Sequence, residues 1–189
     1  MSYQDSAEPL ARGLEYLRMV RCFALEPGMV DAMELASDRI QICTWIGENI
    51  HKVNAQLNNY LQSCHECFHI RERRHIRIFA APLAQRLGID GICNILSYPI
   101  TILVDVGRVA PPNWLGLVAH EYAHAHLRES GHNQKFANVV SHLSLGLGLE
   151  PPSWDVGKME TCLRNWPHCE STREPLAFWK GVKFREFLL

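Results

Sequence analysis

Apolar residues recur at every third or fourth position along the first third of the chain, which is the spacing of helices with one buried face. Residues 8–25 carry such a stripe and are predicted to form a helix. A short helix is predicted over residues 29–35, and a longer one over 38–61, with Asp38 as its expected N-cap. We therefore expect residues 1–70 to form an amino-terminal layer of helices.

The pattern changes after residue 75 from helical spacing to the short apolar runs that are typical of strands. Three strands are predicted, over residues 76–80, 91–96 and 100–105. Ser97-Tyr98-Pro99 separates the last two, and these turn-forming residues favour a hairpin. A small three-stranded sheet is therefore expected before the next helix begins.

Two further helices and a tail complete the chain. Pro111-Pro112-Asn113 supplies a helix start, and residues 114–127 are then free of Pro and apolar on nearly all sides, which predicts a buried helix. Gly131 is expected to end this helix and reverse the chain into a second one over residues 132–147. The tail over residues 151–189 is rich in Trp, Pro and Cys, and we expect it to wrap the domain or to line a substrate groove with its aromatic rings.

A length of 189 residues favours one domain with a substantial core. The predicted fold class is α+β, with a helical layer (1–70), a sheet with two helices (71–150) and a wrapping tail (151–189). The formal net charge of −1 gives no strong field for nucleic acid or membrane. No apolar run reaches the ~18 residues that span a bilayer, and no basic leader begins the chain, so we expect a cytoplasmic protein without a membrane partner.

A His-Glu-x-x-His sequence within the predicted helix 114–127 indicates metal chemistry. His120 and His124 lie one helical turn apart, so both imidazoles project from one face and can reach one ion. Glu121 points about a quarter-turn away, from where a carboxylate can touch a water bound to that ion. Histidines and a glutamate are costly to bury unless they are paired or bind an ion, so we favour a metal site over a histidine cluster without an ion.

The sequence offers a third ligand just past the predicted glycine bend. His132 follows Gly131 and is expected to fall back beside His120 and His124, although a solvated loop residue is the alternative. Three histidines and one water would form the open, four-coordinate zinc site that is associated with catalysis. His142, on the following helix, is expected to lie in the core or to support the site without being a fourth ligand.

The run His120-Glu121-x-x-His124, then Gly131-His132-x-x-x-Phe136 after a short spacer, resembles the SprT-like branch of the zincin metallopeptidases. The resemblance covers roughly residues 100–145. It implies a zincin-like α+β fold in which His120, His124 and His132 hold Zn²⁺ and Glu121 is the catalytic carboxylate. In zincins, the strand nearest the active cleft binds an extended peptide as one more strand, and one of the three predicted strands would do so here.

The function predicted from these residues is zinc-dependent hydrolysis of a peptide or protein substrate. Zinc would lower the pKa of its bound water from 15.7 toward about 7, and Glu121 would take the proton as general base. A regulatory or interaction protein that binds zinc without catalysis is the main alternative. Tyr98, Tyr122 and His126 are candidate donors to the oxyanion, but Tyr122 and His126 are expected to face away from the metal.

Cysteine and arginine clusters suggest two further sites. The seven cysteines include Cys64 and Cys67, which could form half of a second zinc site or a redox pair, although ordinary thiols on a helix face are the favoured interpretation. The candidates to complete such a site are Cys162, Cys169 and His69. Residues 71–77 form a basic run in which Arg73, Arg74 and Arg77 could contact nucleic acid, but a solvated element end is favoured.

Overall fold

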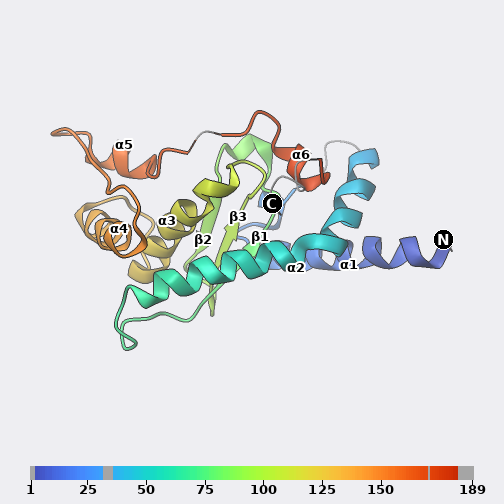
Figure 1. Ribbon diagram of the computed structural model, residues 1–189, viewed down its shortest axis with the longest axis horizontal. Helices are drawn as coiled ribbons and strands as arrows, with labels where there is room; N and C mark the ends of the chain where they lie inside the picture. Colours follow the sequence, from blue (N-terminus) through green and yellow to red (C-terminus); the bar gives the residue numbers. More distant parts are fainter. Residues whose placement is uncertain (1–2, 32–35, 170, 183–189) are drawn as a thin grey trace.

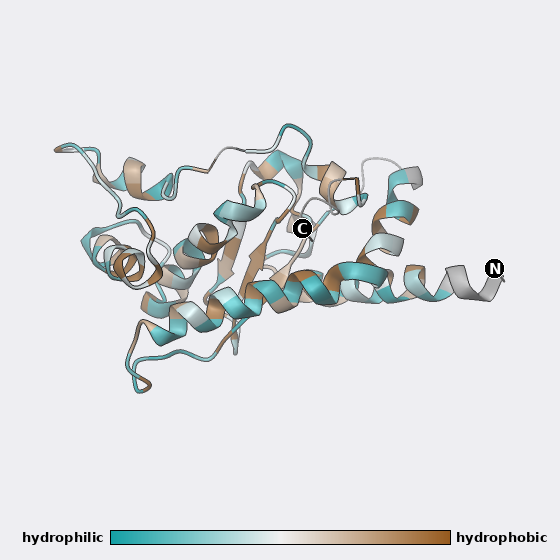
Figure 2. Cartoon of the chain, viewed as in Figure 1, coloured by the Kyte–Doolittle hydropathy of each residue, from teal (hydrophilic) through white to brown (hydrophobic). Residues whose placement is uncertain are grey.

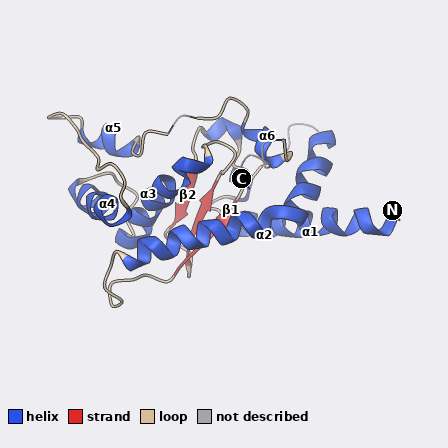
Figure 3. Ribbon diagram, viewed as in Figure 1, coloured by secondary structure: helices blue, strands red, loops and turns tan. Residues whose placement is uncertain are grey.

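The computed structural model describes residues 3–31, 36–169 and 171–182. Over these ranges the chain has an α+β fold of six α-helices and one three-stranded mixed sheet (Figures 1 and 3). The helices and strands are α1 (Tyr3–Phe23), α2 (Ala36–Glu66), β1 (Ile76–Ala80), β2 (Gly91–Asn94), β3 (Ile100–Val104), α3 (Trp114–Leu127), α4 (Gln134–Leu147), α5 (Met159–Arg164) and α6 (Pro175–Trp179).

The amino-terminal helical layer is confirmed by α1 and α2, which pack closely against each other. Asp38 lies within the first turn of α2 and is not its cap. The glycines Gly13 and Gly47 stand where the two helices meet, because a Cβ at Gly13 would overlap the carbonyl of Cys43 and one at Gly47 would overlap that of Pro9. The absence of side chains at these two positions therefore sets how closely the helices approach.

The short helix predicted over residues 29–35 is wrong where the structure describes it. Met29 ends a single 3₁₀ turn, and Val30 forms an isolated antiparallel bridge with Leu83. The carbonyl of Met29 accepts a hydrogen bond from the backbone N–H of Ala84, so backbone pairing with a distant loop draws this stretch into an extended form. Residues 32–35 lie outside the described residues.

The sheet has the order β1-β3-β2, with β1 parallel and β2 antiparallel to the central strand β3. The predicted strands and the hairpin are thus confirmed, although β2 ends at Asn94 because the next residues turn. β2 is an edge strand. Since Asp105 N–H donates to the carbonyl of Asp90, the ladder directs the backbone N–H and C=O groups of Gly91 and Cys93 away from β3.

The central strand β3 is buried at all five positions, whereas the outer strands β1 and β2 alternate between buried and half-buried positions. α3 packs against β2 and β3, while α2 packs against β1 and α3. Figure 2 shows the strands as the hydrophobic centre of the fold, with polar residues on the outer faces of the helices. No helix in the described part of the chain has both the length and the apolar character to cross a bilayer.

The bend between α3 and α4 differs from its prediction. Arg128, and not Gly131, takes the left-handed conformation that ends α3, with φ at 57°. The chain therefore reverses directly after the last helical turn, before Gly131 is reached. Asn133 then caps α4 by accepting hydrogen bonds from the N–H groups of Lys135 and Phe136.

The tail packs onto the domain as expected, because Trp166, Phe178 and Trp179 are buried. Trp179 donates its indole N–H to Asp105 Oδ1 at 2.8 Å, which ties α6 to the end of β3. Trp154 is the exception among these described aromatics, with 37% of its surface exposed. Phe184 and Phe187 lie outside the described residues.

Replacing Gly13 by Ala should lower the free energy of unfolding by more than about 2 kcal/mol, because the new Cβ has to displace the backbone of α2. Urea denaturation followed by circular dichroism measures the change. Gly28→Ala is the matched control, since a Cβ there would make only an ordinary 3.5 Å contact with the Arg86 side chain. Equal stability of the two variants would contradict the close approach of α1 and α2.

Candidate metal centre

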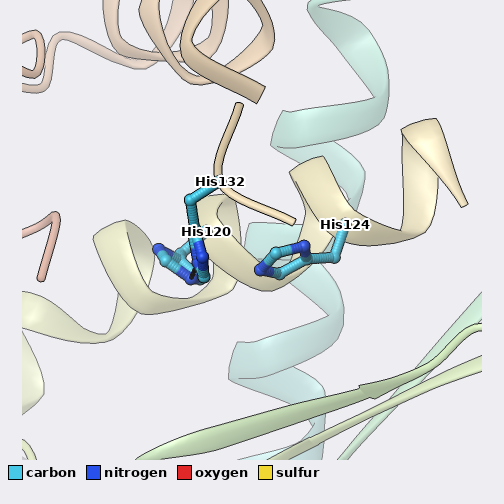
Figure 4. Close-up of side chains that lie close together, drawn as sticks. All are labelled: His120, His124 and His132. Atoms are coloured by element: carbon cyan, nitrogen blue, oxygen red, sulfur yellow. Dashed lines mark hydrogen bonds between the residues drawn. The ribbon is translucent and has the colours of Figure 1, made fainter. Parts of the chain in front are cut away.

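The structure brings together the three histidines that the sequence predicts as ligands. His120 and His124 project from one face of α3, and His132 reaches back to them from the loop before α4 (Figure 4). One ring nitrogen from each lies within 4.8 Å of the other two. Within the described ranges, no other set of three or more His, Cys, Asp or Glu side chains is gathered in this way.

Backbone carbonyls hold the rings of the two helical histidines. His120 Nδ1 lies 2.5 Å from the carbonyl oxygen of Trp166, and His124 Nδ1 lies 2.9 Å from that of Glu129. A carbonyl only accepts, so each Nδ1 must carry the proton and each Nε2 must present a lone pair. A donor bond from the second ring nitrogen to a carbonyl is the usual support of a metal-binding histidine.

The separation of the ring nitrogens fits one small cation. His132 Nε2 lies 3.2 Å from His120 Nε2. Two ligands at the usual Zn–N distance in a tetrahedral site lie about 3.3 Å apart, so these two nitrogens already have the spacing of zinc ligands. The donors of this site therefore suit zinc, or another divalent ion that imidazoles bind.

Phe136 forms an apolar support for all three imidazoles. Its ring centroid lies 5.0, 4.6 and 4.8 Å from those of His120, His124 and His132. The Phe136 side chain is fully buried on the first turn of α4. The helix that follows the bend therefore fixes the rings from one side, which leaves them little freedom to separate.

The environment of the site keeps its histidines neutral. Burial lowers the pKa of His120 to about 3, and the charges of His124 and His132 add to the effect. Burial likewise lowers the pKa of His124, and it lowers that of His132 to about 4, with further contributions from His124 and Arg164. Neutral imidazole is the form that binds metal ions, so the three rings are ready to do so at neutral pH.

Glu121 lies against the edge strand β2. A Cβ at Gly91 would stand 2.7 Å from Glu121 Oε1, so the missing side chain of Gly91 makes room for this carboxylate. Glu121 is 7% exposed, and burial raises its pKa to about 8, with the charge of Asp90 adding to the rise. The sequence predicts Glu121 about a quarter-turn from the helix face that carries His120 and His124. The structure adds that this side chain packs against Gly91 of β2.

Two contributors to the site could not be found in the sequence. Trp166, whose carbonyl accepts from His120, lies 46 residues further along the chain, and a backbone acceptor leaves no signature in residue type. Asp90, whose charge acts on Glu121, lies beside Gly91 at the start of β2. In the sequence, Asp90 is one acidic residue before a short predicted strand, and nothing in that pattern distinguishes it as part of the site.

The other polar residues considered for the site lie elsewhere. Tyr122 and His126 face away from the triad as predicted, since the Tyr122 hydroxyl lies 3.0 Å from His65 Nδ1 and His126 stacks on Phe68. Tyr98 is 85% exposed at the tip of the hairpin. The prediction that His142 lies in the core or supports the site is wrong, because His142 is exposed and its ring contacts the Cys67 carbonyl and Phe68 beyond the end of α2.

The Cys64 and Cys67 thiols lie at the end of α2, where Cys64 is fully buried and Cys67 Sγ donates to the carbonyl of Ser63. Among the described residues, no third His, Cys, Asp or Glu donor gathers with these two thiols. Burial raises the pKa of both, which keeps them protonated and poorly reactive.

Three arginines of the basic run over residues 71–77 make side-chain hydrogen bonds within the protein. The Nε atoms of these arginines each donate a hydrogen bond: Arg73 to the carbonyl of Phe68, Arg74 to the carbonyl of His126, and Arg77 to Thr101 Oγ1. These bonds give the side chains a structural role. Binding of nucleic acid stays a prediction to which the structure adds no support.

A cavity of about 550 Å³ lies apart from the triad, next to the loop before α3. Phe178 lines it, together with Tyr60 and Glu174, and none of the three histidines does so. Of the tail aromatics that were considered as walls of a substrate groove, Phe178 thus borders a cavity that is not at the metal centre. The geometry of the histidines identifies the site better than the volume of this cavity.

Comparison with family models, with curated proteins and with solved structures finds no match to the chain. The chemistry of the site is therefore inferred from its own residues.

Replacing His132 by Ala should weaken zinc binding by more than ~100-fold, because losing a ligand costs more than losing a group that merely orients one. Competition with a chromophoric chelator measures the affinity. His126→Ala is the matched control, since His126 lies on the same helix but faces Phe68. An unchanged affinity in His132→Ala, or an equal loss in the control, would contradict the three-histidine site.

The raised pKa of Glu121 predicts a pH effect on the metal-free protein. Between the ordinary carboxyl pKa and about 8, the folded protein keeps a proton that the unfolded chain has lost, so stability falls as pH rises. From pH 7 to 8.5 this loss is about 1 kcal/mol, and Glu121→Gln should remove it.

Urea denaturation of chelator-treated protein at pH 7 and pH 8.5 measures this effect. The histidines contribute little here, because their pKa values lie lower in both the folded and the unfolded state. Equal pH dependence in the wild type and in Glu121→Gln would show that Glu121 is already ionised in the fold.

Proposed function

We propose that this protein is a zincin-like zinc hydrolase that cleaves peptide bonds. The observation that carries the proposal is the convergence of three neutral imidazoles, two of them fixed by carbonyls, beside a buried carboxylate on the same helix. Three protein ligands leave a coordination position open, which is typical of catalytic zinc and not of structural zinc. The resemblance of the His-Glu-x-x-His segment to SprT-like zincins supports the same assignment.

His120, His124 and His132 would hold the ion, and zinc there would supply an acidified water and a Lewis acid for a carbonyl group. The protein's own contribution is to keep the ligands neutral and their rings oriented. Burial keeps the rings neutral, while the carbonyls of Trp166 and Glu129 fix their orientation.

Glu121 is suited to accept and return a proton. Its carboxylate is buried between α3 and β2, where burial and Asp90 raise its pKa to about 8. A base is most effective when its pKa lies near the working pH, because it then both accepts and releases a proton readily. In the proposed reaction Glu121 takes the proton of the attacking water and passes it to the leaving amine.

The edge strand β2 is the proposed binding place for the substrate chain. It is the strand next to Glu121, and the N–H and C=O groups of Gly91 and the N–H of Cys93 point away from β3, while the Cys93 carbonyl accepts from the N–H of Ile95. An extended peptide can pair with such an edge as an additional strand. This pairing recognises backbone and favours unfolded peptide segments as the substrate class.

The test uses a library of short, unstructured peptides, with cleavage products identified by mass spectrometry after incubation with zinc-loaded protein. Glu121→Gln should reduce the cleavage rate by ~10²-fold or more while zinc content stays at the wild-type level. His120→Ala should lose both zinc and cleavage. The inactive Glu121→Gln protein also serves as the control for contaminating proteases.

Two outcomes would contradict the proposal. Cleavage at the wild-type rate in Glu121→Gln would contradict the proposed role of Glu121 as the general base. Full zinc occupancy in the wild type, with no cleavage above the level of Glu121→Gln, would favour the alternative of a regulatory or interaction protein that binds zinc without catalysis.

A further inference from the structure

After α5 the chain passes against α3, the helix that carries His120 and His124 and that we call the metal helix. In Figure 1 the chain returns from α4 through α5 toward α6, and on this path Trp166 contacts His120. We call residues 163–167 the strap. Its residues Leu163 and Trp166 are buried, with 0% and 6% of their surfaces exposed, so it is packed onto the domain.

The strap supplies the acceptor that fixes His120. The carbonyl of Trp166 lies 2.5 Å from His120 Nδ1, which leaves Nε2 directed at His132. His124 obtains the equivalent bond from Glu129, only five residues away on the same bend. One ligand is therefore oriented locally, whereas the other depends on a segment that is 46 residues distant in sequence.

The indole of Trp166 anchors the strap at one point. Its Nε1–H donates to the carbonyl of Glu150 at 3.0 Å, in the loop that follows α4. The backbone N–H of Trp166 donates to the carbonyl of Leu163, which continues the last turn of α5. Two hydrogen bonds from Trp166, one from its indole and one from its backbone N–H, thus hold its carbonyl in place beside His120.

Gly116 provides the second anchor, on the metal helix itself. A Cβ at Gly116 would lie 2.6 Å from Cγ of Pro167, so the Pro167 ring occupies the space that any side chain would need. Gly116 stands one helical turn before His120, on the same side of α3. A glycine inside a helix costs ~1 kcal/mol relative to Ala, and here that cost makes room for the strap.

We propose that the strap is a positioning element of the metal centre: it orients His120 through the Trp166 carbonyl, so that ion binding at the three histidines and docking of the strap on α3 stabilise each other. The proposal rests on the metal-binding part of the proposed function and does not require hydrolysis. Such coupling is reciprocal, so the ion must hold the strap as strongly as the strap favours the ion.

Two variants should weaken the packing of the strap on the domain, one at its contact with α3 and one at its contact with the loop after α4. Gly116→Ala pushes Pro167 away while it improves helix propensity, and Trp166→Phe removes the bond to Glu150. Each should weaken zinc binding by about 10- to 100-fold in chelator competition. Trp154→Phe is the matched control, because Trp154 lies in the same tail but is 37% exposed, and it should keep the wild-type affinity.

Two further measurements report on the geometry of the bound ion and on the coupling between ion binding and docking of the strap. The visible absorption bands of the Co²⁺-loaded protein should change in Gly116→Ala and Trp166→Phe, which a role in packing alone would not produce. Hydrogen exchange at the amides of Asn165 and Trp166 should slow when zinc is added to the wild type. In His132→Ala, where the site lacks a ligand, the slowing should be lost.

Wild-type affinity and Co²⁺ spectra in both folded variants would overturn the proposal. Exchange in the wild-type strap that does not respond to zinc would overturn it as well, and that measurement needs no variant to fold. Tight zinc binding that the strap variants weaken, without cleavage of the peptide library, would support the strap and reject only the hydrolase. A wild type that does not bind zinc would reject both.

Discussion

The site depends on three imidazoles whose ring nitrogens converge on one small volume. Carbonyl acceptors at Nδ1 place the lone pairs of His120 and His124 at Nε2, and His132 Nε2 lies 3.2 Å from that of His120. Lone pairs repel one another unless a proton or a cation lies between them. Burial lowers the pKa of the rings, so the charged imidazolium form is disfavoured and the neutral rings are available to a cation. The convergence of these three neutral rings is therefore compatible with binding of a metal ion.

Close packing around the histidines depends on two glycines as well as on side-chain contacts. Gly91 makes room for Glu121 at the edge strand, and Gly116 makes room for Pro167 on the metal helix. Phe136, by contrast, fills the space behind all three rings. α3 is thus packed between an edge strand, a following helix and a returning tail, and each of these contributes one boundary of the site.

The same burial has opposite effects on the pKa of Glu121 and on the pKa values of the three histidines. It lowers the pKa of His120 to about 3 and raises that of Glu121 to about 8, because it disfavours the charged form of each. At neutral pH the buried histidines and Glu121 are consequently all in their uncharged forms. An ion at the triad would bring positive charge close to this carboxylate and favour its ionised form.

The sequence by itself determined α1 to α4, the three strands and the grouping of the three histidines, because these depend on local spacing: one helical turn joins His120 to His124, and a short bend returns His132. It misplaced the bend at Gly131, since Arg128 could take the left-handed conformation, and it predicted a helix where Val30 pairs with a distant loop. Only the tertiary structure decided that β2 borders Glu121 and that a carbonyl 46 residues away orients His120. Those contacts join backbone groups far apart in the chain, and backbone groups are the same at every residue, so no sequence pattern records them.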